Sequence, residues 1–162
     1  MKVLLARREL CVACGACEEV CAPTFFKAPD RERSAIRVTP PTGPWETEPE
    51  LWDPDCTIEF CDQCGECIAV CPTRALFRSR DGIVRLRKRD CVGCLACVGF
   101  CPTLVMYVHP DDTLPFKCVA CGKCVDECPA DALLMAEVEI PAGITELTRS
   151  VRSGTGGTAD GN

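Results

Sequence analysis

The chain has 162 residues, a formal net charge of −6 and 47% apolar residues, and 17 of its residues are cysteine. Aromatic residues make up only 6%, so a small domain of this composition needs disulfides, metal or a partner for stability. The acidic charge argues against nucleic acid as a partner and suits docking to a basic patch on another protein.

The first predicted element is a cysteine-rich loop, CVACGACEEVC, which is followed by Ala22 and Pro23. The same motif recurs as CDQCGECIAVCP, CVGCLACVGFCP and CVACGKCVDECP, so the chain holds four runs with the same spacing of cysteines. The sixteen cysteines of these runs are Cys11, Cys14, Cys17, Cys21, Cys61, Cys64, Cys67, Cys71, Cys91, Cys94, Cys97, Cys101, Cys118, Cys121, Cys124 and Cys128. The remaining cysteine, Cys56, is expected to be a buried small apolar residue, with substitution for a neighbouring ligand as the alternative.

A proline-rich insertion, residues 28–55, separates the first run from the second. Ser34–Thr39 is predicted to form a strand, and the rest is predicted to form a surface loop. The insertion carries both tryptophans of the chain, Trp45 and Trp52. We expect them either to cover a cofactor or to dock a partner.

A hairpin is predicted after the second run. In LFRSRDGIVRLRKRDC the Asp81-Gly82 pair is a hairpin turn signal between two short apolar stretches. The alternation of charged and apolar residues indicates a solvated strand face, and a docking patch for a partner is the alternative. The basic residues concentrated there are Arg78, Arg80, Arg85, Arg87, Lys88 and Arg89.

Proline follows the fourth cysteine of the last three runs, at Pro72, Pro102 and Pro129. Because proline is favoured in the first turn of a helix, each Cys-Pro pair is predicted to begin a short helix. Each unit then reads as loop, short helix, strand, turn and strand, and four such units form an internal repeat. In the first run Pro23 comes one place later, so the backbone near Cys21 departs from the pattern.

The last residues, 141–162, lose apolar periodicity and end rich in glycine, which predicts disorder at the end of the chain. Within them, ITELTRSV is expected to form an arm against another subunit.

Thiolates are soft ligands that select zinc or iron–sulfur clusters. Zinc sites typically combine two separated ligand pairs, often with histidine, whereas three cysteines at i, i+3 and i+6 wrap three corners of a cubane. In the bacterial C-x2-C-x2-C-x3-C-P run the last cysteine ligates the other cluster of a two-cluster protein. Glycines between the cysteines permit positive φ and close approach to sulfide, and they are Gly15, Gly65, Gly93 and Gly122.

Apolar residues beside the cysteines are expected to pack in the core and to shield the clusters from water, which sets their potential. They are Val12, Ile68, Val92, Val98, Val119 and Val125.

A disulfide-rich secreted scaffold fits the cysteines less well, because their number is odd, one spacing repeats and no signal peptide is recognised. No stretch is long and apolar enough to span a membrane. These observations predict a cytoplasmic protein in a reducing compartment.

Residues Cys11 to Ala136 resemble the four-cluster ferredoxin-type subunits of molybdenum- and tungsten-pterin oxidoreductases. The short length and FKC before the fourth run are most similar to the small subunit of bacterial tungsten aldehyde oxidoreductases. The resemblance implies four [4Fe–4S] clusters and an α+β, loop-rich fold of two intertwined bacterial-ferredoxin-like modules. The modules would be residues 1–27 plus 103–140 and residues 56–102.

In that family the first run shares clusters with the fourth, and the second run with the third. Carried onto this chain, the resemblance implies a first set (Cys11, Cys14, Cys17, Cys128), a second set (Cys61, Cys64, Cys67, Cys101), a third set (Cys91, Cys94, Cys97, Cys71) and a fourth set (Cys118, Cys121, Cys124, Cys21). From spacing alone, sharing between the third and fourth runs stays open, because the second and third runs start 30 residues apart and the third and fourth 27 apart.

The sequence offers no catalytic constellation, so the chain is expected to transfer electrons and not to be catalytic alone. The resemblance implies a subunit of an anaerobic oxidoreductase complex that passes single electrons between a large tungsten- or molybdenum-pterin subunit and a flavin subunit or soluble ferredoxin. The alternatives are a free polyferredoxin, an iron–sulfur subunit of a hydrogenase, formate or carbon monoxide dehydrogenase complex, a zinc-binding structural module and a cluster-based redox sensor.

Overall fold

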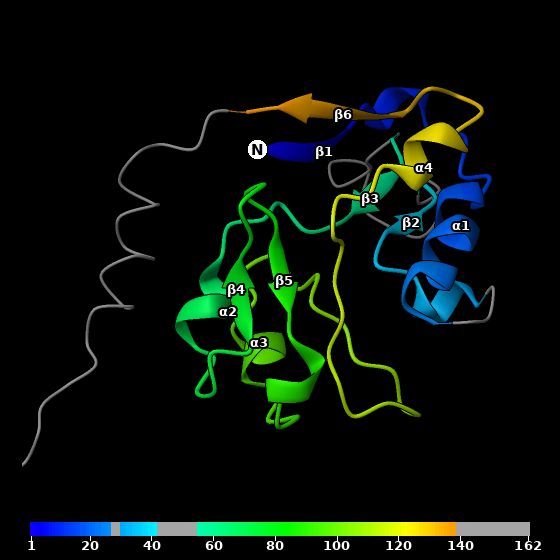
Figure 1. Cartoon of the computed structure of the whole chain (residues 1–162). Helices are drawn as coiled ribbons and strands as arrows, with labels where there is room; N and C mark the ends of the chain where they lie inside the picture. Colours follow the sequence, from blue (N-terminus) through cyan, green and yellow to red (C-terminus); the bar gives the residue numbers. More distant parts are fainter. Residues whose placement is uncertain (27–29, 42–54, 139–162) are drawn as a thin grey trace, which may run out of the picture.

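The computed structural model of the chain describes residues 1–26, 30–41 and 55–138 (Figure 1). Its strands are β1 (Lys2–Ala6), β2 (Arg37–Thr39), β3 (Thr57–Glu59), β4 (Leu76–Arg78), β5 (Val84–Leu86) and β6 (Leu133–Glu137). Its helices are α1 (Ala16–Phe25), α2 (Glu66–Ala69), α3 (Ala96–Gly99) and α4 (Lys123–Asp126), with 3-10 turns η1 (Arg8–Leu10), η2 (Arg31–Arg33) and η4 (Lys88–Asp90). The two tryptophans and the expected C-terminal arm lie outside these residues.

Strands pair only in twos within the described ranges, and every pair is antiparallel. The β1–β6 pair joins the two ends of the described chain, with Lys2 opposite Glu137 and Ala6 opposite Leu133. Strands β4 and β5 form the predicted hairpin, and Gly82 in its turn has φ +84°. The turn signal in the sequence therefore located this hairpin correctly.

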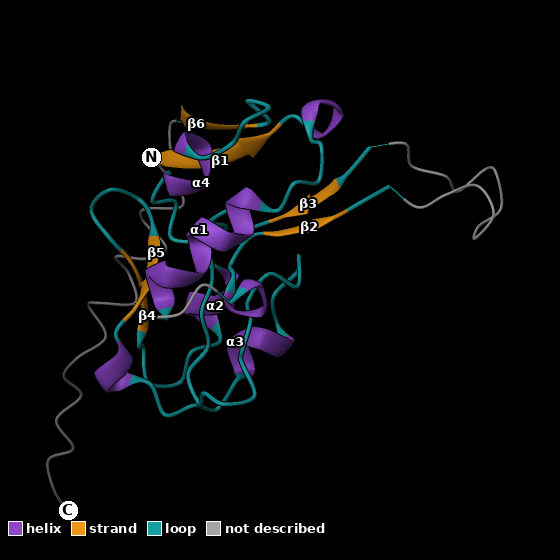
Figure 2. Ribbon diagram, turned by 90° about the vertical axis from the view of Figure 1, so that its right-hand side faces the viewer, coloured by secondary structure: helices purple, strands orange, loops and turns teal. Residues whose placement is uncertain are grey.

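Strands β2 and β3 form an antiparallel pair on either side of residues 42–54, which lie outside the described chain (Figure 2). The predicted strand Ser34–Thr39 begins only at Arg37. The Ser34 hydroxyl donates to the Ile36 carbonyl at 2.6 Å and accepts from the Ile36 N–H at 3.2 Å. This local bonding competes with strand pairing, so the first residues stay outside the ladder.

The helices do not begin at the Cys-Pro pairs, so that prediction is wrong. The Cys-Pro segments are turns closed by the third residue after the cysteine, as in the 3.2 Å bond from the Arg74 N–H to the Cys71 carbonyl. Arg74, Leu104 and Asp131, at equivalent positions, have φ of +55°, +56° and +50°. A left-handed residue cannot continue a right-handed helix. Each helix instead begins between the second and third cysteines of its run.

Helix α1 is longer than the other three, and its run is the one without a proline directly after the fourth cysteine. In the second run Pro72 follows Cys71, and α2 ends ahead of Cys71 because a residue before proline is disfavoured in the helical region. In the first run Cys21 is followed by Ala22 and stays helical, and α1 continues to Phe25 even though Ala22 itself precedes Pro23.

Side chains pack into two apolar cores. The larger core joins α1, α4, β1 and β6 through residues such as Leu4, Phe116 and Leu133. An aromatic group supports it, since the Phe116 ring lies 5.0 Å from Phe26 and 5.9 Å from Tyr107. The smaller core lies between α2, α3 and the β4–β5 hairpin, and Figure 1 shows this part as the green half of the molecule.

The architecture is thus α+β and loop-rich, with few short helices and small sheets, as predicted. The finer division into residues 1–27 plus 103–140 and residues 56–102 stays a prediction. In the described part of the chain no helix has the length and apolarity required to cross a membrane.

Candidate metal centres

Each cysteine run folds in the same way. The residue before the second cysteine and the residue after it both have positive φ, which curls the loop tightly before the helix starts. The curl turns backbone N–H groups toward sulfur, as in the 3.4 Å contacts from Gln63 N to Cys61 Sγ and from Ala120 N to Cys118 Sγ. Leu95 takes the position that glycine holds in the other three runs, and it adopts φ +57° despite its side chain.

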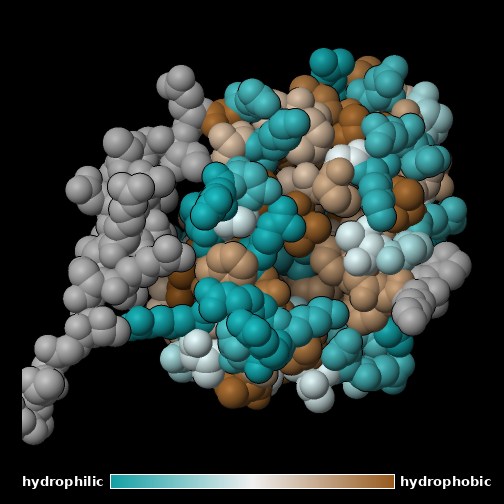
Figure 3. All heavy atoms as spheres, in the orientation of Figure 1, coloured by the Kyte–Doolittle hydropathy of each residue, from teal (hydrophilic) through white to brown (hydrophobic). Residues whose placement is uncertain are grey.

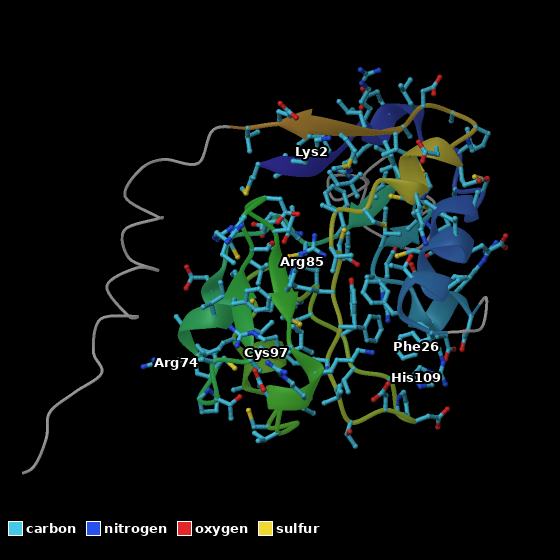
Figure 4. The ribbon with its side chains drawn as sticks, viewed as in Figure 1. Lys2, Phe26, Arg74, Arg85, Cys97 and His109 are labelled. Carbon is cyan, nitrogen blue, oxygen red and sulfur yellow. The ribbon has the colours of Figure 1, made fainter. Side chains whose placement is uncertain are left out.

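Four cavities lie against these loops. Each cavity is lined by three cysteines of one run and one cysteine of another. Their thiols are Cys11, Cys14, Cys17 and Cys128; Cys118, Cys121, Cys124 and Cys21; Cys61, Cys64, Cys67 and Cys101; and Cys91, Cys94, Cys97 and Cys71. In residues 1–26, 30–41 and 55–138, no three His, Cys, Asp or Glu side chains are placed to hold a single metal ion. Figure 4 labels Cys97, which lies on α3 and belongs to the smaller core.

The third cysteine of every run is buried. Burial, with a smaller contribution from neighbouring charges, raises the pKa of Cys17 to about 12, and burial likewise raises the pKa of Cys124 to about 12. In the second run, burial raises the pKa of Cys67 to about 12, although Lys117 opposes the rise. A bare thiolate is therefore unfavourable in these places, and a bound cation is what would stabilise it. Four thiols around one cavity, with a buried one among them, fit a cluster that carries several metal ions.

In the second and third runs the pKa of the fourth cysteine is lowered and not raised. Burial works to raise the pKa of Cys71, but backbone N–H groups near Leu76 and the Thr73 hydroxyl outweigh it and lower that pKa. At Cys101 the Thr103 hydroxyl and nearby backbone groups lower the pKa in the same way against burial. The Cys-Pro-Thr turn thus supplies hydrogen-bond donors for a sulfur that carries negative charge.

Five of the six apolar residues beside the cysteines divide into two groups, and the sixth, Val119, is half-buried and lines the cavity of its run. Ile68 and Val98 pack against the smaller core and Val125 against the larger one, as predicted. Val12 and Val92 line their cavities but are 66% and 67% exposed, so the prediction that they pack in the core is wrong. The loop turns outward at these two positions, which follow the first cysteine of their runs.

A buried polar bridge that sequence reasoning missed joins two of the runs. Gln63 is 1% exposed and Lys117 is 5% exposed. Lys117 Nζ donates to Gln63 Oε1 at 2.9 Å and to the Cys118 carbonyl at 3.0 Å, while Gln63 Nε2 donates to the same carbonyl at 3.0 Å. The only sequence signal was a lysine between Phe116 and Cys118, in surroundings where an exposed charge is unexpected.

The basic hairpin is not one uniform solvated face. Arg78 donates to the backbone carbonyls of Gln63 at 3.0 Å, Cys64 at 2.9 Å and Gly82 at 2.8 Å. It therefore braces the loop of the second run. Arg85 pairs with Asp81 at 2.8 Å and follows the predicted solvated pattern. Hydrophilic side chains gather over this hairpin in Figure 3.

Cys56 is 3% exposed, as expected for a buried small residue. Its thiol donates to the Cys11 carbonyl at 3.3 Å, and Arg8 Nε donates to the Cys56 carbonyl at 2.9 Å. Cys56 lines none of the four cavities described above.

Comparison with known proteins identifies the cofactor. Residues 60–105 and 83–129 each match a 4Fe-4S dicluster domain, and residues 8–24 match a 4Fe-4S binding domain. The chain therefore carries several [4Fe–4S] clusters, as predicted.

The chain is 35% identical to the B subunit of polysulfide reductase from Wolinella succinogenes over 82% of this chain and 74% of that protein. It is 32% identical to the ferredoxin-like protein YdhX of Escherichia coli, and the match spans 81% of the present sequence and less than two thirds, 63%, of YdhX. It is 27% identical to the thiosulfate reductase electron transfer subunit PhsB of Salmonella typhi over 85% of this chain and 76% of that one. Among solved structures, a chain of the benzoyl coenzyme A reductase complex BamBC gives a TM-score of 0.46 at 22% identity, over 97% of this chain and 92% of that one. The identity to the polysulfide reductase subunit extends along most of both proteins, and this protein belongs to the same family of ferredoxin-type 4Fe–4S electron-transfer proteins.

Proposed function

We propose that this chain is the electron-relay subunit of a reductase complex whose catalytic subunit carries a molybdenum or tungsten pterin. The observation that carries the proposal is the continuous succession of the four thiol sets through the molecule. Membership of the 4Fe–4S family supports it.

We propose further that the thiols lining each cavity ligate one [4Fe–4S] cluster, which gives four clusters in the four sets defined from the resemblance. Support comes from the cavity linings, in which the first run meets Cys128 and the fourth run meets Cys21. In the same way the second run meets Cys101 and the third run meets Cys71. Fully thiolate-ligated clusters have no open position for a substrate, so the chain would not be catalytic alone.

The four sets follow one another in a row. Helix α1, which carries Cys17 of the first set, contacts α4, which carries Cys124 of the fourth set. Gln63, in the loop of the second set, donates to the carbonyl of Cys118 in the fourth set. Helix α2 of the second set contacts α3 of the third set. These contacts give the order first, fourth, second and third.

A row of this kind has a simple chemical use. When bound, [4Fe–4S] clusters exchange single electrons without changing their ligands. The loops of this chain would hold them at fixed places and cover them with apolar side chains and backbone N–H groups. Such a row spans a distance that a single cluster cannot.

The partner is inferred from the relatives and from the surface. Relatives named as the B subunit of polysulfide reductase and as the electron transfer subunit of thiosulfate reductase favour a reductase complex. Exposed apolar side chains beside the cysteine loops, Val92, Phe100 and Leu104, are 67%, 68% and 73% exposed and suit contact with another protein. A tungsten aldehyde oxidoreductase is our finer proposal for the catalytic subunit, with a flavin subunit or a soluble ferredoxin at the other end and a cytoplasmic location.

The proposal predicts that the untagged protein, isolated anaerobically from its own source, has the native mass of a complex with a larger subunit containing molybdenum or tungsten. Adding the substrate of that subunit should bleach the visible absorbance of the iron–sulfur chain. A protein that elutes alone with its full iron content would contradict the role of committed subunit and would indicate a free polyferredoxin.

The shared ligation predicts a specific pattern of cluster loss. Cys11→Ala, Cys128→Ala and the double variant should each lose or convert the same single cluster, because both thiols line one cavity. Iron and labile sulfide per chain, with low-temperature EPR of the reduced protein, measure this loss. Cys56→Ala removes a buried thiol outside the four cavities and should keep all the iron. A double variant that loses two clusters would refute this ligand set and favour sharing between the third and fourth runs.

The contacts of Arg78 with the loop of the second run predict that alanine destabilises the protein more at Gly65 than at Gly122, which holds the same position in the fourth run. Gly65 and Gly122 have φ of +96° and +83°, so alanine strains both. A Cβ at Gly65 would lie 2.5 Å from the guanidinium of Arg78, which three carbonyls hold in place, whereas at Gly122 the nearest atom is 3.7 Å away on Met135. Displacing Arg78 forfeits about 1–3 kcal/mol of hydrogen bonding.

Heating both variants at one rate while following cluster absorbance compares them. The transition of Gly65→Ala should lie lower than that of Gly122→Ala by about 2–4 °C for each kcal/mol. Equal transitions, or the reverse order, would show that Arg78 does not brace this loop.

A further inference from the structure

Lys117 is a buried cation at the junction between the second and fourth thiol sets. It is 5% exposed, it lines the cavity of the second set, and it directly precedes Cys118 of the fourth set. The long segment that leads into α4 runs between the two halves of the molecule in Figure 1. Lys117 therefore lies against the thiols of the second set and next in sequence to a thiol of the fourth set.

No carboxylate pairs with Lys117 among the ion pairs of the described residues. Its two acceptors, Gln63 Oε1 and the Cys118 carbonyl, are neutral. A buried ammonium without a negative partner is strongly unfavourable, and lysine is almost never buried unless it is paired. The thiol sets on either side would supply the missing negative charge, because a cluster with four thiolate ligands is anionic.

The surroundings hold the ammonium in one place. Gln63 accepts from Lys117 and from the Val84 N–H at 3.1 Å through Oε1, and its Nε2 donates to the Cys118 carbonyl at 3.0 Å. The amide is thereby locked between the loop of the second run, the hairpin and the loop of the fourth run.

Resting on the proposed function, we propose that Lys117 places a fixed positive charge between the two central clusters and makes both of them easier to reduce. Reduction adds an electron to an already anionic group. A buried cation stabilises the reduced form more than the oxidised form, because charges interact strongly where water is excluded. Net charge around a cluster is one of the factors that set its reduction potential. Lys117 is thus a positioning residue for electron transfer and needs no contact with a substrate.

The simpler interpretation is that Lys117 only joins two loops through its hydrogen bonds. Two neutral variants separate the roles. Lys117→Met removes the charge and the donors, while Lys117→Gln removes the charge but keeps donors for nearby oxygens. Lys117→Arg retains the charge. Lys88→Met removes an exposed lysine three residues before Cys91 and is the matched control for loss of one positive charge.

The experiment is an EPR-monitored redox titration of the holoprotein in its native complex, with dithionite as reductant and iron counted in each sample. In Lys117→Met and Lys117→Gln, two of the cluster midpoints should fall. At a fixed potential the ratio of oxidised to reduced cluster should rise about tenfold, which is about 59 mV for a one-electron couple. The other midpoints, and all midpoints of Lys117→Arg and Lys88→Met, should stay at wild-type values.

Unchanged midpoints in both neutral variants, at wild-type iron content, would overturn the role of the charge and leave the proposed function intact. Loss of the two central clusters from both neutral variants would also overturn it, because Lys117 would then be a structural link. A wild-type protein without reducible clusters would overturn the proposed function and this inference together.

Discussion

Each of the four cavities beside the cysteine loops takes three thiols from one loop and a fourth from another run, and the rest of the described fold serves this sharing. Cys128 can line the cavity of the first run only if the end of the described chain returns to its beginning. The β1–β6 pair makes that return, with Leu133 opposite Ala6. Cys71 and Cys101 each line the cavity of the other's run, so the second and third runs must lie side by side, and α2, α3 and the β4–β5 hairpin pack together in the smaller core.

The curled cysteine loops also explain the positions of two positively charged side chains, Arg78 and Lys117. A loop curled by left-handed residues leaves backbone carbonyls without partners in a helix or sheet, and these must be satisfied when buried. Arg78 satisfies carbonyls of the second run, and Lys117 satisfies that of Cys118. Both side chains hold loops that carry thiols, and their charges would favour anionic clusters beside them. An acidic protein thus keeps selected cations close to its cysteine loops.

Much of this could be predicted from the sequence, because the cysteine spacing is itself a description of a cluster-binding loop. The four runs, the α+β class and the hairpin at Asp81-Gly82 depend on short stretches of chain, so local patterns were enough. The helices were misplaced because proline after cysteine indicates either a helix start or a turn. The left-handed backbone at Arg74 and its counterparts, which decides for the turn, has no signature in those side chains.

The Gln63–Lys117 bridge could not be predicted for a different reason. The two residues are 54 positions apart, and nothing in either stretch indicates the other. Their contact depends on how the second and fourth runs pack. The exposure of Val12 and Val92 likewise depends on which way a loop turns once it is folded. Tertiary arrangement, and not local propensity, determines these features.

The most direct test of the account is to count iron, acid-labile sulfide and zinc per chain in the anaerobically isolated protein. The account predicts iron and sulfide sufficient for four [4Fe–4S] clusters, all bleached by dithionite, because four cavities each present four thiols. Zinc in place of iron, or iron for fewer clusters than there are thiol sets, would contradict it.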